Sequence, residues 1–238
     1  MAKKRRRANV PGQNALLAAL PEPDREGLRA RLEPVSLSLK EVLYEKNAPI
    51  THIYFPLTSV FSLVITMSDG QAAEVGTVGN EGMVGMSVYF GVPTSPQRAF
   101  AQVPGEALRM RAEDFREELG RDGPLRAVLG LYNQALITQM AYSVACNRLH
   151  SIEERMCRWL LMTQDRVGAD QLPLTQEFLA QMLGVRRPSV TVVAGVLQKA
   201  GLIAYGRGRV VVLDRQRLEA ASCECYRVVR DEYDELLG

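Results

Sequence analysis

The stretch Leu174-Thr-Gln-Glu-Phe-Leu-Ala-Gln-Met-Leu-Gly-Val-Arg-Arg-Pro-Ser-Val-Thr-Val-Val-Ala-Gly-Val-Leu-Gln-Lys-Ala-Gly-Leu-Ile203 decides the fold of the C-terminal part of the chain. Thr175 is a residue type that caps helix N-termini, and Gly184 can adopt the positive φ with which many helices end. Pro188 falls in the first turn of a second helix, where a backbone N–H has no helical partner and the lack of one in proline costs nothing. The stretch therefore predicts two short helices around a glycine turn, a helix-turn-helix.

Each of the two predicted helices has one apolar face that can be buried, and the second helix has a basic start. Arg186 and Arg187 precede its first full turn, and Gly201 ends it. Such a helix fits the major groove of DNA, with its N-terminal residues nearest the base edges. The apolar faces comprise Phe178, Leu179, Met182 and Leu183 in the first helix and Val190, Val193, Ala194 and Leu197 in the second.

The next segment, residues 202–213, predicts a strand, a glycine turn and a second strand, with Arg207 and Arg209 at the tip. A basic tip of this kind suits contact with phosphates or the minor groove. Residues 175–215 hold six cationic and two anionic side chains, and this local excess favours a nucleic-acid-binding surface. A helix-turn-helix pattern alone also fits a plain helical hairpin, but the basic wing favours DNA binding.

The side chains of this region suggest separate roles on DNA. Arg187 can donate two hydrogen bonds to O6 and N7 of guanine. The start of the first helix can meet phosphate through side chains and backbone N–H groups. Short hydroxyl side chains in the second helix can contact bases or phosphate. The predicted DNA-binding residues are Thr175, Gln176, Arg186, Arg187, Ser189, Thr191, Arg207 and Arg209.

The N-terminal half has a different periodicity. Residues 13–32 predict helix interrupted by Pro21 and Pro23. From Val35 to about Met110, short runs rich in Val, Ile, Phe, Tyr and Thr alternate with turn signals, which is typical of a small sandwich or barrel. The Asp-Gly pair in Ser68-Asp-Gly70, between two apolar runs, predicts a hairpin turn.

A long helix is predicted from Leu125 to about Leu149, roughly 37 Å at 1.5 Å per residue. Its apolar residues recur at spacings of three and four, which makes an amphipathic stripe. The stripe fits either packing on the chain's own domain or a two-helix dimer seam, and its length and narrowness favour the seam. Ser151-Ile-Glu-Glu154 then predicts a capping box, and Trp159 in the helix that it opens is expected in the core. The predicted seam is Leu125, Leu129, Tyr132, Leu136, Met140 and Val144.

Cysteine and histidine usage argues against a metal site or an enzyme. The chain has no CxxC pair and only two histidines, His52 and His150, neither with an obvious nucleophile or metal ligand nearby in sequence. Buried reduced thiols are the ordinary alternative. We therefore expect no catalytic residue, no metal and no cofactor, with a small effector left open. The four cysteines are Cys146, Cys157, Cys223 and Cys225.

From these residues, the sequence resembles the Crp–Fnr family of bacterial transcription regulators. The resemblance is strongest from Leu174 to Ile203 and extends to Leu149-His-Ser-Ile-Glu-Glu-Arg-Met-Cys-Arg-Trp-Leu-Leu161. It implies an α+β fold with an N-terminal jelly-roll β-domain of the cyclic-nucleotide-binding type, a long dimerisation helix and a C-terminal winged helix-turn-helix. The family's iron–sulfur version uses cysteines near the N-terminus, and none precedes Cys146 here.

Two departures from the family pattern limit what can be transferred. Pro188 replaces the glutamate that usually follows the recognition arginine, so the usual operator sequence does not carry over. In the β-domain, Gly85 matches the family's ligand-binding glycine, but Met86 stands in place of the ribose-binding glutamate. Arg98 matches the phosphate-binding arginine, although Ala99 follows it. These four residues are the candidate ligand site. The absence of a bound effector is favoured over a small ligand other than cyclic AMP, and cyclic AMP itself is the least favoured alternative.

The sequence therefore predicts a basic disordered tail at 1–11, a β-roll sensor at 12–120, a dimerisation helix at 121–149 and a DNA-binding domain at 150–238. The five cations from Lys3 to Arg7 could add salt-sensitive phosphate affinity. No apolar run approaches the ~20 residues of a membrane span, and the N-terminus lacks a signal-peptide pattern, so we expect a cytoplasmic protein.

The leading hypothesis is a homodimeric, sequence-specific regulator that binds double-stranded DNA, with RNA polymerase as a further candidate partner. The alternative is a ligand-binding module whose helix-turn-helix serves as a protein-docking platform. Enzymatic activity is the weakest of the three.

Overall fold

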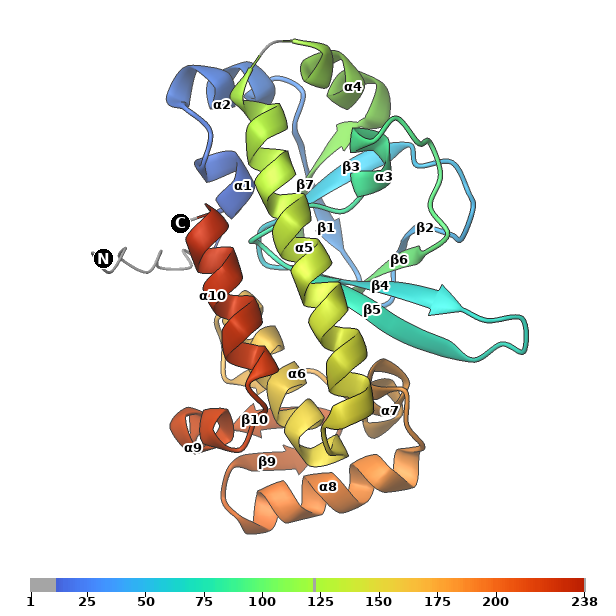
Figure 1. Ribbon diagram of the computed structural model, residues 1–238, viewed down its shortest axis with the longest axis vertical. Helices are drawn as coiled ribbons and strands as arrows, with labels where there is room; N and C mark the ends of the chain where they lie inside the picture. The colour runs from blue at the N-terminus through green and yellow to red at the C-terminus, as the bar shows by residue number, and fades with distance from the viewer. Residues whose placement is uncertain (1–11, 122, 238) are drawn as a thin grey trace.

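The computed structural model describes residues 12–121 and 123–237. A β-roll lies beside a long helix, and a winged helical head lies at the C-terminal end of that helix (Figure 1). The predicted basic tail lies outside the described residues.

The β-roll consists of two facing antiparallel sheets, as the alternating pattern predicts. Side chains such as Ile53, Phe55 and Phe61 are buried in the main hydrophobic core. One sheet has the order β1 (Glu33–Leu37), β7 (Gly105–Arg111), β3 (His52–Pro56), and the other has the order β2 (Val42–Tyr44), β6 (Arg98–Val103), β4 (Val60–Thr66), β5 (Ala72–Val78).

The predicted hairpin turn is confirmed between β4 and β5. Gly70 has a φ of 84°, and the Met67 N–H donates to the Gln71 carbonyl at 2.8 Å. The predicted N-terminal helical region is also present as two pieces, α1 (Ala15–Ala18) and α2 (Glu22–Arg29), with Pro23 in the first turn of α2. Two further helices flank the roll: α3 (Met86–Tyr89) and α4 (Ala112–Gly120).

The long helix α5 (Pro124–Leu149) corrects the predicted dimer seam. Leu129 and Tyr132 are fully buried within the chain itself, and the Tyr132 hydroxyl donates to the Met83 carbonyl at 3.0 Å. An amphipathic stripe shows that a helix has a buried face but not which surface covers it, and here the β-roll and its neighbours cover it. Of the six predicted seam residues, Leu125, Leu129, Tyr132 and Leu136 are buried, Met140 is half-buried, and Val144 is exposed.

The last helix, α10 (Cys225–Leu237), runs alongside α5 (Figure 1). Thr138 of α5 donates to Glu232 of α10 at 3.1 Å, and the rings of Tyr132 and Tyr233 lie 6.4 Å apart. The buried face of α5 is therefore shared between the β-roll and α10. No helix among the described residues is both long and apolar enough to span a bilayer.

The winged head lies at the end of the molecule where α5 finishes (Figure 1). The predicted capping box is present: the Glu154 N–H donates to Ser151 Oγ, and the Ser151 N–H donates to Glu154 Oε2. A small sheet of order β8–β10–β9 backs the helices. The elements are α6 (Ile152–Val167), β8 (Gln171–Leu172), α7 (Gln176–Leu183), α8 (Arg187–Lys199), β9 (Ile203–Gly206), β10 (Arg209–Val212) and α9 (Arg215–Ala220).

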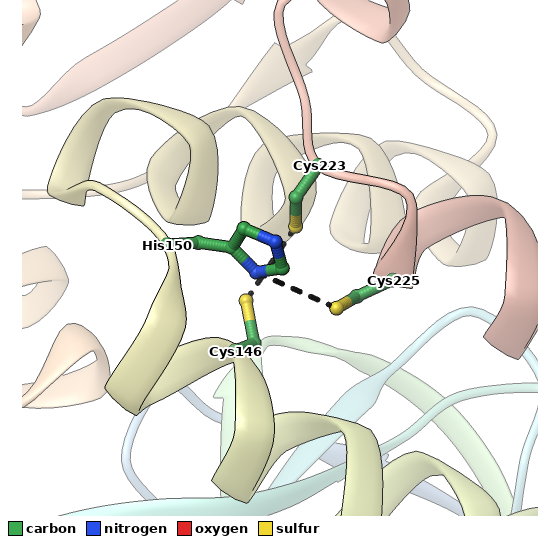
Figure 2. A group of neighbouring side chains, drawn as sticks. All are labelled: Cys146, His150, Cys223 and Cys225. Carbon is green, nitrogen blue, oxygen red and sulfur yellow. Dashed lines mark hydrogen bonds between the residues drawn. The ribbon is translucent and has the colours of Figure 1, made fainter.

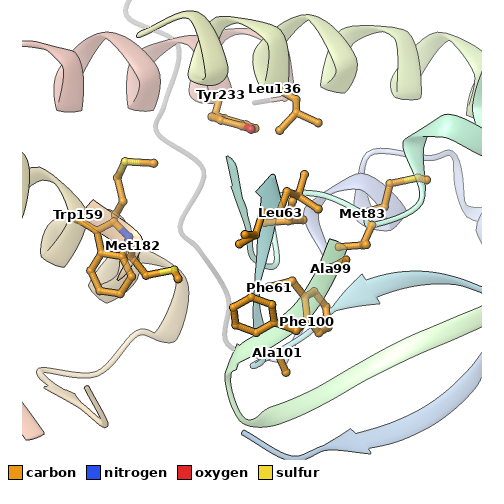
Figure 3. Packing of buried hydrophobic residues seen from close by; sticks show 14 of the residues in the cluster. Phe61, Leu63, Met83, Ala99, Phe100, Ala101, Leu136, Trp159, Met182 and Tyr233 are labelled. Carbon is orange, nitrogen blue, oxygen red and sulfur yellow. The ribbon is translucent and has the colours of Figure 1, made fainter. Parts of the chain in front are cut away.

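The head packs on the β-roll, and Figure 3 shows Trp159 and Met182 of the head on the side opposite Phe61 and Phe100 of the roll. The Phe178 ring of α7 meets Phe100 of β6 edge-on at 6.4 Å, and it meets Trp159 of α6 at 6.2 Å. Met182 Sδ lies 3.5 Å from Ser62 Oγ of β4. Trp159 is buried as expected, and it lies where the two parts of the chain meet. The position of α7 therefore depends on the surface of the β-roll.

Candidate nucleic-acid interface

The first helix of the predicted motif forms as its sequence dictates. Thr175 is the N-cap of α7, and its Oγ accepts a hydrogen bond from the Phe178 N–H at 3.1 Å. Gly184 ends the helix with a φ of 62°, which costs glycine little and other residues more. This left-handed residue turns the chain into α8, so the helix-turn-helix is confirmed.

The second helix, α8, buries one face and presents the other to solvent. Val190, Ala194 and Leu197 are buried, as predicted, and Val193 is half-buried. Pro188 lies in the first turn. Within the predicted contact set, Arg186, Arg187 and Thr191 are exposed and Ser189 is half-buried.

The wing is a two-residue hairpin whose conformation projects an arginine. Arg209 pairs with Gly206, which leaves Arg207 and Gly208 as the turn. Both turn residues have positive φ, 52° and 72°, as a type I′ turn requires. Residues other than glycine seldom adopt a positive φ, and the conformation is somewhat strained for them. The exposed Arg207 side chain therefore occupies a position where glycine would be conformationally easier.

Contacts bring the predicted residues onto one surface. Thr191 Oγ1 donates to Gln176 Oε1 at 2.7 Å, which joins the exposed starts of α8 and α7. A Cβ on Gly208 would lie 3.5 Å from Thr175 Cγ2, so the wing tip lies beside the start of α7.

Arg187 lies close to the wing strand β9. Burial raises the pKa of Tyr205, on that strand, to about 12, and the positive charge of Arg187 opposes the rise. The Tyr205 hydroxyl is buried without a hydrogen-bond partner among the described residues. The start of α7 thus lies beside both α8, which carries Arg187, and the tip of the wing.

The cations of this surface are available to a partner. Arg186, Arg187, Arg207 and Arg209 are exposed, and none forms an ion pair within 12–121 or 123–237. Arg215 differs, because it pairs with Asp165 of α6 at 2.5 Å. An unpaired cationic surface is the expected electrostatic counterpart of a polyanion.

Two exposed valines on α8 were missed in the sequence analysis. Val192 is 67% exposed and Val196 is 46% exposed, one turn apart on the outer face. The helical spacing could have revealed them, because both fall away from the face that buries Val190 and Leu197. Apolar side chains in a major groove can contact the thymine methyl group.

The structure places two of the four candidate ligand-binding residues in the wall of a small cavity and the other two on the adjacent strand β6. Gly85 and Met86 line a cavity of about 170 Å³ between the β-roll and α5, but Arg98 and Ala99 are not among its lining residues. Arg98 instead pairs with Glu45 at 3.2 Å, and its guanidinium lies 5.5 Å from the centre of the Phe100 ring. The cavity is smaller than the ~300–1,000 Å³ typical of ligand pockets.

Gly85 has a structural explanation that requires no ligand. Its φ is 110°, and a Cβ there would lie 2.6 Å from Ile53 Cδ1. Only glycine fits this backbone and this contact without strain.

A polar network joins the β-roll to the head. Glu74 is half-buried, but its carboxyl group is enclosed: it accepts from Ser62 Oγ at 2.5 Å, from Trp159 Nε1 at 2.8 Å and from Thr77 Oγ1 at 3.1 Å. Burial of this carboxyl raises the pKa of Glu74, although these donors and Arg166 act in the opposite direction.

Arg166 belongs to the same junction. Its guanidinium pairs with Glu81 at 2.7 Å and donates to Gln139 Oε1 of α5 at 2.9 Å. Side chains of the β-roll, α5 and α6 thus meet in one hydrogen-bonded group.

Although the sequence shows no closely spaced metal ligands, four of the five residues in the set of cysteines and His150 lie together in the structure. Cys146, His150, Cys223 and Cys225 converge where α5 ends and α10 begins (Figure 2). Cys146 and Cys223 are 77 positions apart in sequence, which is why their proximity was missed.

The other cysteine and the other histidine lie outside this group. Cys157 is a core thiol, and burial raises its pKa to about 12. His52 is a half-buried strand residue beside Thr51.

Comparison with known proteins agrees with this architecture. Residues 34–122 match the model of the cyclic nucleotide-binding domain, and residues 154–221 match the Crp-like helix-turn-helix domain. Together these two models span more than half of the chain. No curated protein sequence matches it.

Three solved structures illustrate the likeness in fold. FixK2 from Bradyrhizobium japonicum has 17% identity and a TM-score of 0.65, with 81% of this chain and 98% of that one covered. The c-di-GMP responsive global regulator CLP of Xanthomonas campestris has 16% identity and a TM-score of 0.66, with 82% and 100% covered. A CRP-family transcriptional regulator from Thermus thermophilus has 18% identity and a TM-score of 0.67, with 79% and 96% covered.

The family models and the geometry of the head lead to the same conclusion. The β-roll, the long helix and the winged helix-turn-helix occur in the order of these regulators, and the exposed basic face belongs to the part that matches the DNA-binding model. The chain belongs to the Crp/Fnr family of DNA-binding transcription regulators.

Proposed function

We propose that the protein binds specific sites in double-stranded DNA as a homodimer. The observation that carries this proposal is the single surface formed by α7, α8 and the wing, with four exposed arginines that have no ion pair among the described residues. An open cationic face on a winged helix-turn-helix suits phosphate binding around a recognition helix in the major groove.

Within that surface we assign base recognition to the start of α8. Arg187 has the fork geometry to donate to guanine O6 and N7. Val192, on the same exposed face, supplies an apolar contact for a thymine methyl. Pro188 offers no acceptor for a cytosine amine, so the preferred half-site differs from that of relatives with glutamate at this position.

The remaining contacts position the head. The exposed starts of α7 and α8, joined by the Gln176–Thr191 hydrogen bond, face one phosphate strand. Arg207 and Arg209 of the wing reach phosphates or the adjacent minor groove. These contacts add affinity that depends on salt and not on base sequence.

We infer that dimerisation uses the outer face of α5. Leu131 is 45%, Ile137 51% and Val144 72% exposed, and small residues such as Gly130 and Ala141 lie among them. The opposite face of the helix is already covered, so this outer face is the one that a second copy can approach closely. Two heads related by this seam would bind half-sites whose centres lie about 10–10.5 bp apart, or a multiple of that.

We propose that the β-roll positions the heads without binding cyclic AMP in the usual way. Met86 cannot accept a hydrogen bond from a ribose hydroxyl, and Arg98 is engaged with Glu45. The cavity beside Met86 suits at most a small effector. RNA polymerase remains a candidate partner of the DNA-bound dimer.

Selection from a random duplex DNA library with the full-length protein tests the proposal. We expect enrichment of an inverted repeat and an affinity that falls steeply with salt. A protein that enriches no motif and shows no salt-dependent DNA affinity would favour the protein-docking alternative.

A further inference from the structure

We propose that Cys146, His150, Cys223 and Cys225 form a binding site for one zinc ion. The four ligand atoms, three sulfurs and one imidazole nitrogen, all lie within 4.8 Å of one another. Tetrahedral coordination with Zn–S bonds of ~2.3 Å places neighbouring ligand atoms about 3.8 Å apart. The observed separations, from 3.5 Å up to at most 4.8 Å, lie on both sides of this value, so only small shifts are needed for the four atoms to share one ion.

The individual contacts show how compact the group is (Figure 2). Cys146 Sγ lies 3.5 Å from Cys223 Sγ, and Cys225 Sγ lies 3.6 Å from His150 Nδ1. A polynuclear iron–sulfur cluster would place several atoms between cysteines bound to different irons. The close approach therefore favours a single ion, and a set of three thiolates and one imidazole in tetrahedral geometry favours zinc.

The histidine is oriented as a metal ligand would be. Its Nε2 lies 3.2 Å from Glu224 Oε2, while its Nδ1 faces the sulfurs. A carboxylate that accepts the proton on one ring nitrogen leaves the lone pair on the other nitrogen free for a metal. Glu224 is itself exposed, so the histidine is held from the solvent side.

The local sequence explains how the four groups converge. Cys146 and His150 are four positions apart at the end of α5, which places them on one side of its last turn. Cys223 and Cys225 flank Glu224 where the chain enters α10. Because α10 lies along α5, the two pairs face each other.

The three thiols do not behave as ordinary core residues. They form a separate small cluster with Tyr142, whereas Cys157 is part of the main hydrophobic core. Buried cysteines that serve only packing are usually dispersed among apolar side chains, as Cys157 is.

Nearby charge suits the loaded site. Three thiolates and a divalent cation leave one net negative charge, and Arg155 and Arg158 at the start of α6 lie within electrostatic reach of Cys146. Arg155 also donates to the carbonyl of Leu183 at the end of α7. A bound ion would link α5 to α10, close to Arg155, whose side chain contacts the end of α7.

The direct test measures metal in the full-length protein purified under thiol-reducing conditions. We expect about one zinc per chain after dialysis against a weak chelator, and a cobalt-substituted protein with the intense visible absorption of tetrahedral Co(II)–thiolate coordination. Cys223→Ser should lose the metal, while the matched control Cys157→Ser should keep it.

A second variant avoids the risk that Cys223→Ser fails to fold. Glu224→Ala changes an exposed side chain and should weaken zinc affinity about 10- to 100-fold, while Glu235→Ala on the exposed side of α10 should leave affinity unchanged. Reduced protein that binds no zinc, or Cys223→Ser protein that keeps it, would overturn the proposal. So would iron and acid-labile sulfide in anaerobically purified protein, or a Cys146–Cys223 disulfide pair with no metal affinity after reduction.

Discussion

In the winged head, Arg187 and Arg207 extend into solvent without an ion pair among the described residues, whereas in the β-roll the candidate ligand arginine, Arg98, pairs with Glu45. The head has cationic side chains available to a partner, whereas the arginine of the roll already forms an ion pair with a carboxylate of the same domain. Both regions keep their family architecture. The difference teaches that the neighbouring carboxylates, and not the arginine alone, decide whether an arginine of this fold is open to a partner.

The largest expected effect comes from separating the two heads. The double substitution Ile137→Glu/Val144→Glu should place charge on the exposed face of α5 and yield monomers by sedimentation analysis. Loss of the second head should weaken binding to an inverted-repeat site by about 10²- to 10⁴-fold. Met67→Glu, at a similarly exposed apolar residue in the β4–β5 hairpin, should leave the dimer intact. A double variant that stays dimeric would place the seam elsewhere.

The next effect tests whether the unpaired arginines of the head differ in role. Arg187→Ala should weaken binding to the selected site by about 1–3 kcal/mol, roughly 5- to 150-fold, and relax specificity at one base pair. Competition titrations with single-base variants of the site measure both. Equal losses on every sequence would make Arg187 a phosphate contact instead of a base contact. The control is Arg29→Ala, which replaces an exposed arginine of α2 and should change neither the affinity nor the specificity.

A smaller and sequence-independent effect is expected at the wing. Arg207→Asn keeps a side chain that tolerates positive φ but removes the charge. The slope of log affinity against log salt should fall by about 0.9, with the same loss on all sequences. Fluorescence anisotropy at a series of salt concentrations gives the slope. An unchanged slope would mean that the wing tip does not reach a phosphate.

The smallest effect concerns the junction between roll and head. Because burial raises the pKa of Glu74 in the folded protein, stability is fully present below the unfolded pKa and declines as the pH rises through the folded pKa. Glu74→Gln should remove this decline and raise the Tm in mildly alkaline buffer, measured by thermal unfolding from about pH 5 to 8.5. The exposed Glu235→Gln should reproduce the wild-type pH profile. A wild-type decline that persists in Glu74→Gln would assign it to another group.

Much of the fold could be predicted because its signals are local. The Thr175 cap, the Gly184 turn and the Ser151–Glu154 capping box each depend on residues within one or two turns, and each is confirmed. The hairpin at Asp69–Gly70 belongs to the same class. Backbone conformations of this kind are set by steric limits and nearby hydrogen-bond partners, which the sequence displays directly.

The errors arose where the partner lies far away along the chain. The stripe on α5 indicated a buried face, but only the packed structure could show that the β-roll and α10 cover it. Likewise Gly85 resembled a ligand-binding glycine, whereas its φ and the closeness of Ile53 explain it without a ligand.

The sequence by itself determined the helices, the turns, the wing and the basic surface of the head, because these follow from periodicity, capping and charge over short spans. Only the tertiary structure decided which face of α5 is free, where Arg98 points and that Cys146, His150, Cys223 and Cys225 meet. The physical reason is that contacts between distant segments depend on how whole elements pack, and such packing leaves no local pattern in the residues that it brings together.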